Sequence, residues 1–194
     1  MLKSICIYCG SSDKIHPSYL DAARQMGKAI AHRGIVLWYG AGGTGLMGAV
    51  ADGALQSGGQ VIGVMPALFY TPSLAHFNLT RLEVVETMHQ RKARLADQAD
   101  AFIALPGGYG TFEEFFEILT WAQIGLHSKP VGLLNTNGYF DPLLAMIDKA
   151  QQEGFIYGEH RLLFGYADQP EALLDALSNH QPPPGLSRWL TREE

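Results

Sequence analysis

Short apolar runs alternate with amphipathic segments along almost the whole chain. The first apolar run, residues 2–8, is followed by residues 17–32, where apolar and small residues recur at helical spacing and Gly34 marks the stop. Apolar runs of this length favour buried strands, and a repeat of three to four residues favours a helix. Strands that alternate with helices call for a largely parallel sheet with helices on both faces. The sequence therefore predicts a doubly wound α/β fold.

The same criteria predict the other elements and the domain organisation. The predicted strands are residues 2–8, 35–39, 60–65, 82–86, 101–105, 131–134 and 162–166. The predicted helices are residues 17–32, 46–56, 88–99, 112–124, 140–152 and 170–177, with residues 66–79 irregular apart from a possible short helix. No repeat or interdomain linker interrupts this order. We therefore expect one nucleotide-binding domain, residues 1–180, followed by a proline-rich, flexible C-terminal tail, residues 181–194.

Charge and hydropathy exclude several classes of partner. The chain has 14 Lys and Arg against 19 Asp and Glu, a net charge of −5. That balance gives no overall field that would attract a nucleic acid, so an anion must be bound by a local device. The start lacks the pattern of a secretory signal, and no apolar stretch is long enough to span a bilayer. We expect a cytoplasmic protein without nucleic-acid or membrane partners.

The two cysteines, Cys6 and Cys9, form a Cys-x-x-Cys pair. In redox proteins this motif opens a helix, whereas here it lies on the predicted first strand. Residues three apart on a strand point to opposite faces, so a disulfide is geometrically unfavourable. A single cysteine pair also makes no zinc site. Two core-lining thiols are the favoured interpretation, and no metal site is predicted.

The first glycine-rich loop, residues 40–45, follows a strand and precedes a helix. Gly40, Gly42 and Gly45 match the spacing of the dinucleotide-binding fingerprint. That fingerprint also needs an acidic residue at the end of the next strand to bind the ribose hydroxyls, and residues 61–66 supply none. The loop is then a tight turn with some ligand contact, or a packing feature alone.

The second glycine-rich loop, residues 106–111, has the sequence Pro-Gly-Gly-Tyr-Gly-Thr and precedes a predicted helix. Its glycines allow close backbone approach, and the free N–H groups and dipole of a helix N-terminus attract a phosphate without a lysine. The Lys-Ser/Thr pair of a Walker A motif is missing, which disfavours ATP hydrolysis. Thr111 and Glu114 also fit a capping box, which would explain them by helix initiation alone.

A basic segment, residues 88–92, precedes this loop and opens the helix that follows the fourth predicted strand. Solvated helix charge is the ordinary explanation for such a run. However, ligands of α/β sheets bind at this edge, where an arginine pairs well with a carboxylate or a phosphate. His89 is expected to be structural rather than catalytic.

These motifs together resemble the LONELY GUY family. Residues 106–114 match its PGGxGTxxE signature, residues 88–92 match the block before it, and residues 9–12 and 40–48 fit its N-terminal half. The resemblance extends to about Leu177. It implies a modified Rossmann fold, a homodimer and no cofactor. It also implies hydrolysis of a cytokinin riboside 5′-monophosphate, or an AMP-like nucleotide, to a free base and ribose 5-phosphate.

The resemblance assigns catalysis to Arg91 and Glu114. It also implies substrate binding by a larger set of residues, namely Gly10, Ser11, Ser12, Gly42, Gly43, Lys92, Gly107, Gly108, Tyr109, Gly110, Thr111, Phe112 and Glu113. Many members carry a glutamate where this chain has Ser73, a difference that bears on base preference. Relatives are often labelled lysine decarboxylases, but no motif here resembles a lysine site for pyridoxal phosphate.

N-glycoside hydrolysis develops positive charge at C1′ and negative charge on the departing base. We expect the Glu114 carboxylate to stabilise the first charge and Arg91 the second. Apolar residues surround the axis of the predicted helix 112–124, which favours a homodimer interface. Two alternatives stay open, a nucleotide-binding protein without turnover and a dinucleotide-dependent oxidoreductase.

Overall fold

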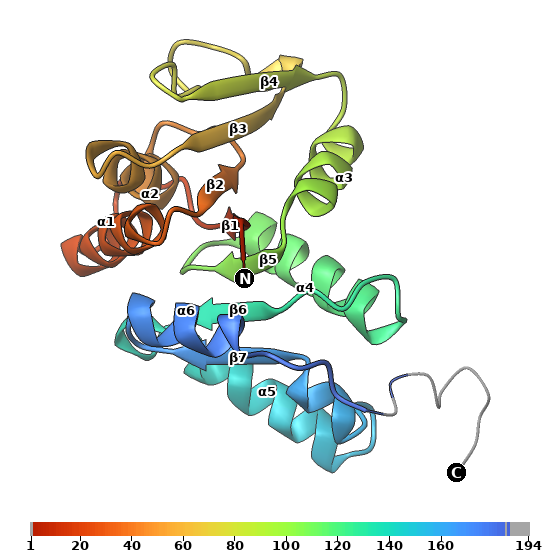
Figure 1. Cartoon of the computed structure of the whole chain (residues 1–194). Helices are drawn as coiled ribbons and strands as arrows, with labels where there is room; N and C mark the ends of the chain where they lie inside the picture. The colour runs from red at the N-terminus through yellow and green to blue at the C-terminus, as the bar shows by residue number, and fades with distance from the viewer. Residues whose placement is uncertain (1, 185, 187–194) are drawn as a thin grey trace.

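A computed structural model describes residues 2–184 and 186, and within these residues seven strands form one sheet (Figure 1). The strands are paired in the order β4-β3-β2-β1-β5-β6-β7, and every pair is parallel. They are β1 (Ser4–Tyr8), β2 (Val36–Tyr39), β3 (Val61–Pro66), β4 (Arg81–Val85), β5 (Ala101–Ala104), β6 (Val131–Leu134) and β7 (Phe164–Ala167).

Six α-helices in the described residues cover the sheet on both sides. One face carries α1 (Pro17–His32), α2 (Gly45–Gln56) and α6 (Pro170–Ser178). The other face carries α3 (Met88–Gln98), α4 (Tyr109–Gln123) and α5 (Asp141–Gln152). Figure 1 shows the two helical layers with the sheet between them. The predicted doubly wound α/β fold is confirmed, and the sheet is parallel throughout.

Two apolar clusters, one on each face of the sheet, form the core. Strand β1 contributes to both, because alternate side chains point to opposite faces. Ile5 and Ile7 pack against α1 and α2, whereas Cys6 and Tyr8 face α3 and α4. Cys9 joins the first cluster, so the two cysteines lie on opposite faces, buried and unbridged. The prediction of two core-lining thiols is confirmed, and burial raises the pKa of each thiol.

Most predicted elements agree with the structure to within two residues, and α1 has the predicted bounds. The start of α4 is an exception. Its N-cap is Gly108 and its first residue is Tyr109, so the prediction that Thr111 caps this helix is wrong. Two glycines allow the backbone to enter the helix three residues earlier, and Thr111 is buried in the first turn.

The remaining predictions on chain organisation fall in the less regular parts. Residues 66–79 contain the 3₁₀ helix η1 (Ala67–Phe69) and otherwise turns and bends. Of the predicted tail, residues 181–194, the structure describes only 181–184 and 186, so the rest lies outside the described residues. No helix of the described residues has the length and hydropathy needed to cross a membrane.

The strand order reverses between β1 and β5. The chain moves outward from β1 to β4 and then returns to the other side of β1 with β5. At such a switch point, the loops at the carboxyl ends of the two strands diverge and leave room for a ligand. These loops are residues 9–16 after β1 and residues 105–108 after β5.

Candidate functional site

The loops after β1 and β5 are packed backbone to backbone. The Gly10 N–H donates a hydrogen bond to the Pro106 carbonyl at 3.0 Å. A Cβ atom on Gly107 would lie 2.8 Å from the Gly10 nitrogen and 2.1 Å from Oγ1 of Thr111. Both glycines are therefore required by close approach. This contact brings two motifs about 100 residues apart in the sequence to one place.

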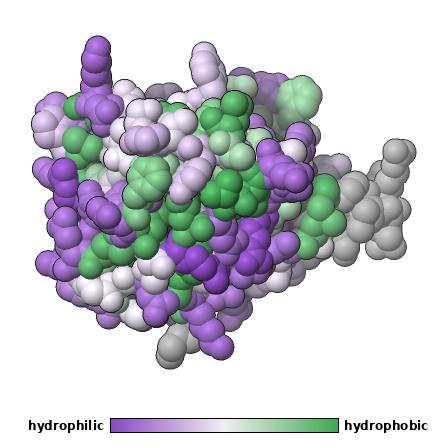
Figure 2. All heavy atoms as spheres, turned by 90° about the horizontal axis from the view of Figure 1, so that it is seen from above, coloured by the Kyte–Doolittle hydropathy of each residue, from purple (hydrophilic) through white to green (hydrophobic). Residues whose placement is uncertain are grey.

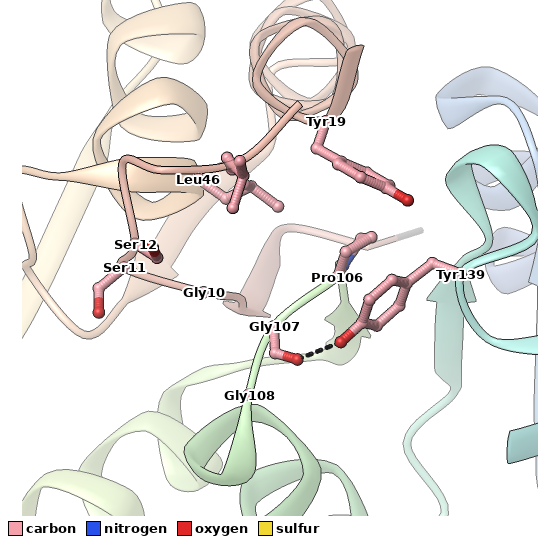
Figure 3. A pocket seen from close by; sticks show the side chains of 10 residues that line it. Gly10, Ser11, Ser12, Tyr19, Leu46, Pro106, Gly107, Gly108 and Tyr139 are labelled. Atoms are coloured by element: carbon pink, nitrogen blue, oxygen red, sulfur yellow. Dashed lines mark hydrogen bonds between the residues drawn. The ribbon is translucent and has the colours of Figure 1, made fainter. Parts of the chain in front are cut away.

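A cavity of about 310 Å³ opens beside this contact, and we call it the glycine-loop cavity. Its polar end consists of glycines and serines, and its apolar end is formed by aliphatic and aromatic side chains. In Figure 3, Ser12 and Leu46 lie on one side of Pro106 and Gly107, and Tyr139 lies on the other. The lining residues are Gly10, Ser11, Ser12, Ile15, Tyr19, Leu46, Pro106, Gly107, Gly108 and Tyr139.

The N-terminus of α4 borders the glycine-loop cavity. The first backbone bond of this helix runs from the Phe112 N–H to the Gly108 carbonyl at 3.1 Å. The N–H groups of Tyr109, Gly110 and Thr111 precede that bond and have no carbonyl partner within the helix. Because no Cβ on Gly108 or Gly110 shields them, these amides and the helix dipole make an anion-binding surface.

The first glycine-rich loop is different, because backbone donors in it and at the start of α2 are bonded within the protein. The Gly43 N–H donates to the Leu74 carbonyl at 2.8 Å, and the Leu46 N–H donates to the Gly10 carbonyl at 3.0 Å. The Gly45 N–H donates to the Asp13 carboxylate at 2.8 Å. The N-terminus of α2 thus binds a carboxylate of the chain itself, and this loop serves packing more than anion binding.

The two predicted catalytic residues meet across the helices α3 and α4. Nη2 of Arg91 lies 3.2 Å from Oε1 of Glu114, and the two side chains are only 13% and 10% exposed. Nη1 of Arg91 also contacts the sulfur of Met88 at 3.1 Å. Nε of Arg91 is buried and has no acceptor in the part of the chain that the structure describes. Each of the two Nη atoms carries two N–H groups and has one of these contacts, so the guanidinium keeps hydrogen-bonding capacity for a ligand.

Glu114 is a buried carboxyl group with a raised pKa. Burial raises its pKa to about 7, although the positive charge of Arg91 partly lowers it. Desolvation disfavours the carboxylate, and the ion pair only partly compensates. A carboxyl group that titrates near neutral pH inside a ligand-binding edge is typical of catalytic acids and bases.

Arg91 opens onto a second, smaller cavity of about 200 Å³, which we call the Arg91 cavity. Ser11 lines both cavities, so the two are neighbours. The position of Arg91 depends on Gly40, because a Cβ there would lie 1.9 Å from Nη2 of Arg91. Three methionines are the most frequent side chains in its walls. The full lining is Ser11, Gly40, Gly42, Thr44, Met47, Met65, Pro66, Phe69, Leu74, Met88 and Arg91.

Lys92 lies in an ion-pair network rather than in either cavity. Its Nζ contacts Oε1 of Glu113 at 2.5 Å and Oε1 of Glu117 at 2.8 Å. Partial burial lowers the pKa of this amine, but the two glutamates outweigh that effect and leave the pKa raised. The network holds α3 against α4 and so fixes the helices that carry Arg91 and Glu114.

The structure brings part of the predicted set together. Around the glycine-loop cavity are Gly10, Ser11, Ser12, Gly107 and Gly108, followed by the amides of Tyr109, Gly110 and Thr111. Gly42 lines the Arg91 cavity.

Other predicted residues lie apart from the two cavities. The Gly43 amide is bonded internally, the Tyr109 side chain is 93% exposed, and Phe112 faces a groove between α4 and α5. Ser73 is exposed, and its hydroxyl is 3.2 Å from that of Thr71.

Several lining residues were not predicted from the sequence. Tyr139 lies 32 residues after Gly107, and its hydroxyl donates to the Gly107 carbonyl at 2.5 Å (Figure 3). Tyr19 meets it edge to face, with 5.9 Å between ring centroids. Both are aromatic residues close to a helix start, a position that gives no sequence signal of its own. Only the spatial arrangement of the strands identifies them.

Comparison with solved structures supports the fold. The molybdenum cofactor binding protein of Rippkaea orientalis superposes with a TM-score of 0.70 at 24% identity, over 92% of this chain and 96% of that protein. The molybdenum cofactor carrier protein of Chlamydomonas reinhardtii gives 0.68 at 23% identity, over 93% and 100%. At these identities, the likeness concerns the fold alone.

Sequence comparison gives the family. Residues 47–177 match the family model described as "Possible lysine decarboxylase". The chain is 47% identical to cytokinin riboside 5′-monophosphate phosphoribohydrolase LOG7 of Arabidopsis thaliana, over 93% of this chain and 83% of that one. It is 48% identical to "Probable cytokinin riboside 5′-monophosphate phosphoribohydrolase LOGL5" of Oryza sativa subsp. japonica, over 94% and 74%. With Arg91, Glu114 and both glycine loops in the matched region, the chain belongs to the LONELY GUY family of cytokinin riboside 5′-monophosphate phosphoribohydrolases.

Proposed function

We propose that this protein hydrolyses the N-glycosidic bond of a cytokinin riboside 5′-monophosphate or an AMP-like nucleotide. The products are the free base and ribose 5-phosphate. The observation that carries the proposal is the buried Arg91–Glu114 pair beside a helix N-terminus with free amides. The family relatives, which bear the name of this activity, support the same reaction.

The 5′-phosphate binds at the N-terminus of α4 in this proposal. The amides of Tyr109, Gly110 and Thr111 donate to the phosphate oxygens, and the helix dipole adds partial positive charge. Ser11 and Ser12 line the same cavity. Binding energy from this remote group fixes the ribose, so that the reacting bond lies at the charged pair.

The bond breaks between the two charged side chains. The Glu114 carboxylate stabilises the positive charge that develops at C1′ and orients the attacking water. Arg91 stabilises the negative charge on the departing base, through the Nη donors that its contacts with Glu114 and Met88 leave free. The base then lies in the Arg91 cavity, whose methionine walls accept a flat apolar group.

A lysine decarboxylase activity has no support at this site. Decarboxylation on pyridoxal phosphate needs a lysine that forms a Schiff base, and such lysines have lowered pKa values. Lys92 has the opposite property, because its two glutamate partners leave its pKa raised.

The quaternary state in this proposal is a homodimer. A groove of about 460 Å³ runs between α4 and α5, and apart from the Tyr139 hydroxyl its lining side chains are apolar. Phe116 and Met146 on these helices are 40% and 66% exposed, an arrangement that marks an interaction surface. Apolar side chains also form patches among polar ones on the face seen from β4 (Figure 2). We place the dimer contact at the α4–α5 groove.

The decisive experiment is incubation of the purified protein with AMP and with N6-isopentenyl-AMP, followed by chromatography. Release of adenine or isopentenyladenine together with ribose 5-phosphate supports the proposal. Nucleotide binding without base release contradicts it and favours the binding protein without turnover. A titration with NAD and NADP tests the oxidoreductase alternative in the same preparation.

A further inference from the structure

Tyr139 is hydrogen-bonded to the glycine loop that precedes α4. Its hydroxyl donates to the Gly107 carbonyl at 2.5 Å across the glycine-loop cavity (Figure 3). On the other side, the Pro106 carbonyl accepts the Gly10 N–H at 3.0 Å. Two successive peptide groups of the loop are therefore held by partners from the loop after β1 and from the segment after β6.

Each of these bonds fixes an amide as well as a carbonyl. In a planar trans peptide, the C=O of one residue and the N–H of the next point in opposite directions. The bond to Pro106 therefore fixes the direction of the Gly107 N–H. The bond from Tyr139 likewise fixes the Gly108 N–H, the last amide before the first residue of α4.

Without Tyr139, the peptide between Gly107 and Gly108 has little to resist rotation. Neither residue has a Cβ, so the flipped conformation carries almost no backbone strain. A flip would exchange the amide for a carbonyl, whose negative end repels a phosphate. The Tyr139 hydroxyl thus favours the orientation in which the Gly107 carbonyl is bonded to the protein.

The backbone around Tyr139 is built to hold this hydroxyl in place. Asn137 and Gly138 precede it in the left-handed region, with φ of 55° and 68°. The buried Asn135 side chain accepts the Phe140 N–H at 2.7 Å and so closes the turn. The Tyr139 ring meets Tyr19 and Phe140 edge to face. The side chain is therefore preorganised rather than recruited by the ligand.

We infer that Tyr139 is a positioning residue for the phosphate group of the substrate, acting through the Gly107–Gly108 peptide. This rests on the proposed function, since it assigns a role in binding the 5′-phosphate. Tyr139 does not touch the reacting bond. Its removal should therefore weaken phosphate binding and leave the chemical step unchanged.

The test compares wild type with Tyr139→Phe, which keeps the ring packing and deletes the hydroxyl. Tyr166→Phe, at an exposed position on β7, is the matched control. For Tyr139→Phe we expect the KM for AMP to rise about threefold to tenfold, as for the loss of one hydrogen bond. We expect kcat and the turnover of adenosine to be unchanged, because adenosine has no phosphate. The preference for AMP over adenosine then falls by the same factor.

A second measurement does not depend on turnover. Calorimetry with ribose 5-phosphate should show weaker binding to Tyr139→Phe than to wild type or Tyr166→Phe. Equal affinity in all three overturns the inference, as does a parallel loss of AMP and adenosine turnover with an unchanged KM. If wild type releases no base, the proposed function fails, while the calorimetric comparison still decides the role of Tyr139.

Discussion

Arg91 and Glu114 approach to 3.2 Å from two different helices, and both side chains are almost completely buried. Breaking a buried pair usually costs more than the pair contributes, because the remaining charge is left uncompensated. Such a pair gives little net stability, and its location at the Arg91 cavity is better explained by chemistry. The following predictions test that explanation and the parts of the site around it.

Glu114→Gln keeps the shape of the side chain and removes its charge. We expect base release from AMP to fall on the order of 100-fold or more, the cost of losing a charge that stabilises the transition state. Glu153→Gln, in an exposed pair with Lys149, is the control that should retain activity. Circular dichroism checks that both variants are folded. Near wild-type release by Glu114→Gln would remove this residue from the mechanism.

The pH dependence follows from the pKa of Glu114, which burial raises to about 7. The carboxylate is the form that stabilises positive charge at C1′, and it is the minor form below that pKa. We therefore expect kcat/KM to rise with pH through about 7, with an acidic limb that Glu114→Gln lacks. The acidic limb is measured from initial rates between pH 5 and pH 9. This range extends about two pH units below and above the pKa, so it includes conditions in which each form of the carboxyl group predominates. A flat profile in wild type would contradict the assignment.

Gly40→Ala tests whether the placement of Arg91 matters. The added Cβ would overlap Nη2 of Arg91, which lies 1.9 Å away, so the guanidinium must move. Since small displacements of a catalytic group are costly, we expect base release to fall about 100-fold. Gly165→Ala on β7 adds a methyl group where no atom lies within 4 Å, and it should keep full activity. Equal activities of the two variants would show that base release does not depend on the position of the Arg91 guanidinium.

Tyr109→Pro removes one amide donor from the proposed phosphate site. Tyr109 is the first residue of α4, a position that tolerates proline, and Gly108 before it is extended. Its side chain is exposed, so Tyr109→Ala is a control that keeps the N–H. We expect only the proline variant to raise the KM for AMP, by roughly tenfold, as for a hydrogen bond to a charged group. Equal KM values in both variants would place the phosphate elsewhere.

The proposed dimer is tested by placing a charge in the α4–α5 groove. We expect Met146→Asp to sediment as a monomer at micromolar concentration, where wild type sediments as a dimer, because an unpaired buried charge opposes association. Leu68→Asp, at an exposed position on η1, is the control and should leave the dimer intact. A monomeric wild type would refute the homodimer.

The fold was largely predictable because its strands are buried apolar runs and its helices carry regular apolar stripes. The bounds of α1 follow from Pro17 at its start and Gly34 after its end. The start of α4 was not predictable, since glycines permit a helical entry that propensity alone disfavours. Long-range packing, which places Thr111 inside the first turn rather than at the cap, decided it.

For the candidate site, the sequence indicated the residues but not their contacts. Arg91 and Glu114 were identified as a pair, and the structure places them in contact. Lys92 was expected to bind substrate, whereas the structure shows it bonded to Glu113 and Glu117. The charge of a lysine does not show whether it binds substrate or a glutamate of the protein, because either role needs a lysine near the same edge of the sheet. Tyr139 had no motif, and only the parallel order of β5 and β6 brings it to Gly107.

The carboxylate of Asp13 at the N-terminus of α2 has a consequence for ligand size. In a Rossmann fold, the glycine-rich turn at this position binds the pyrophosphate bridge of a dinucleotide. In this protein, a carboxylate of the chain itself lies at that turn. A dinucleotide would have to displace the Asp13 carboxylate from the Gly45 N–H and overcome its electrostatic repulsion. A ligand with a single phosphoryl group, by contrast, needs only the amides that open α4.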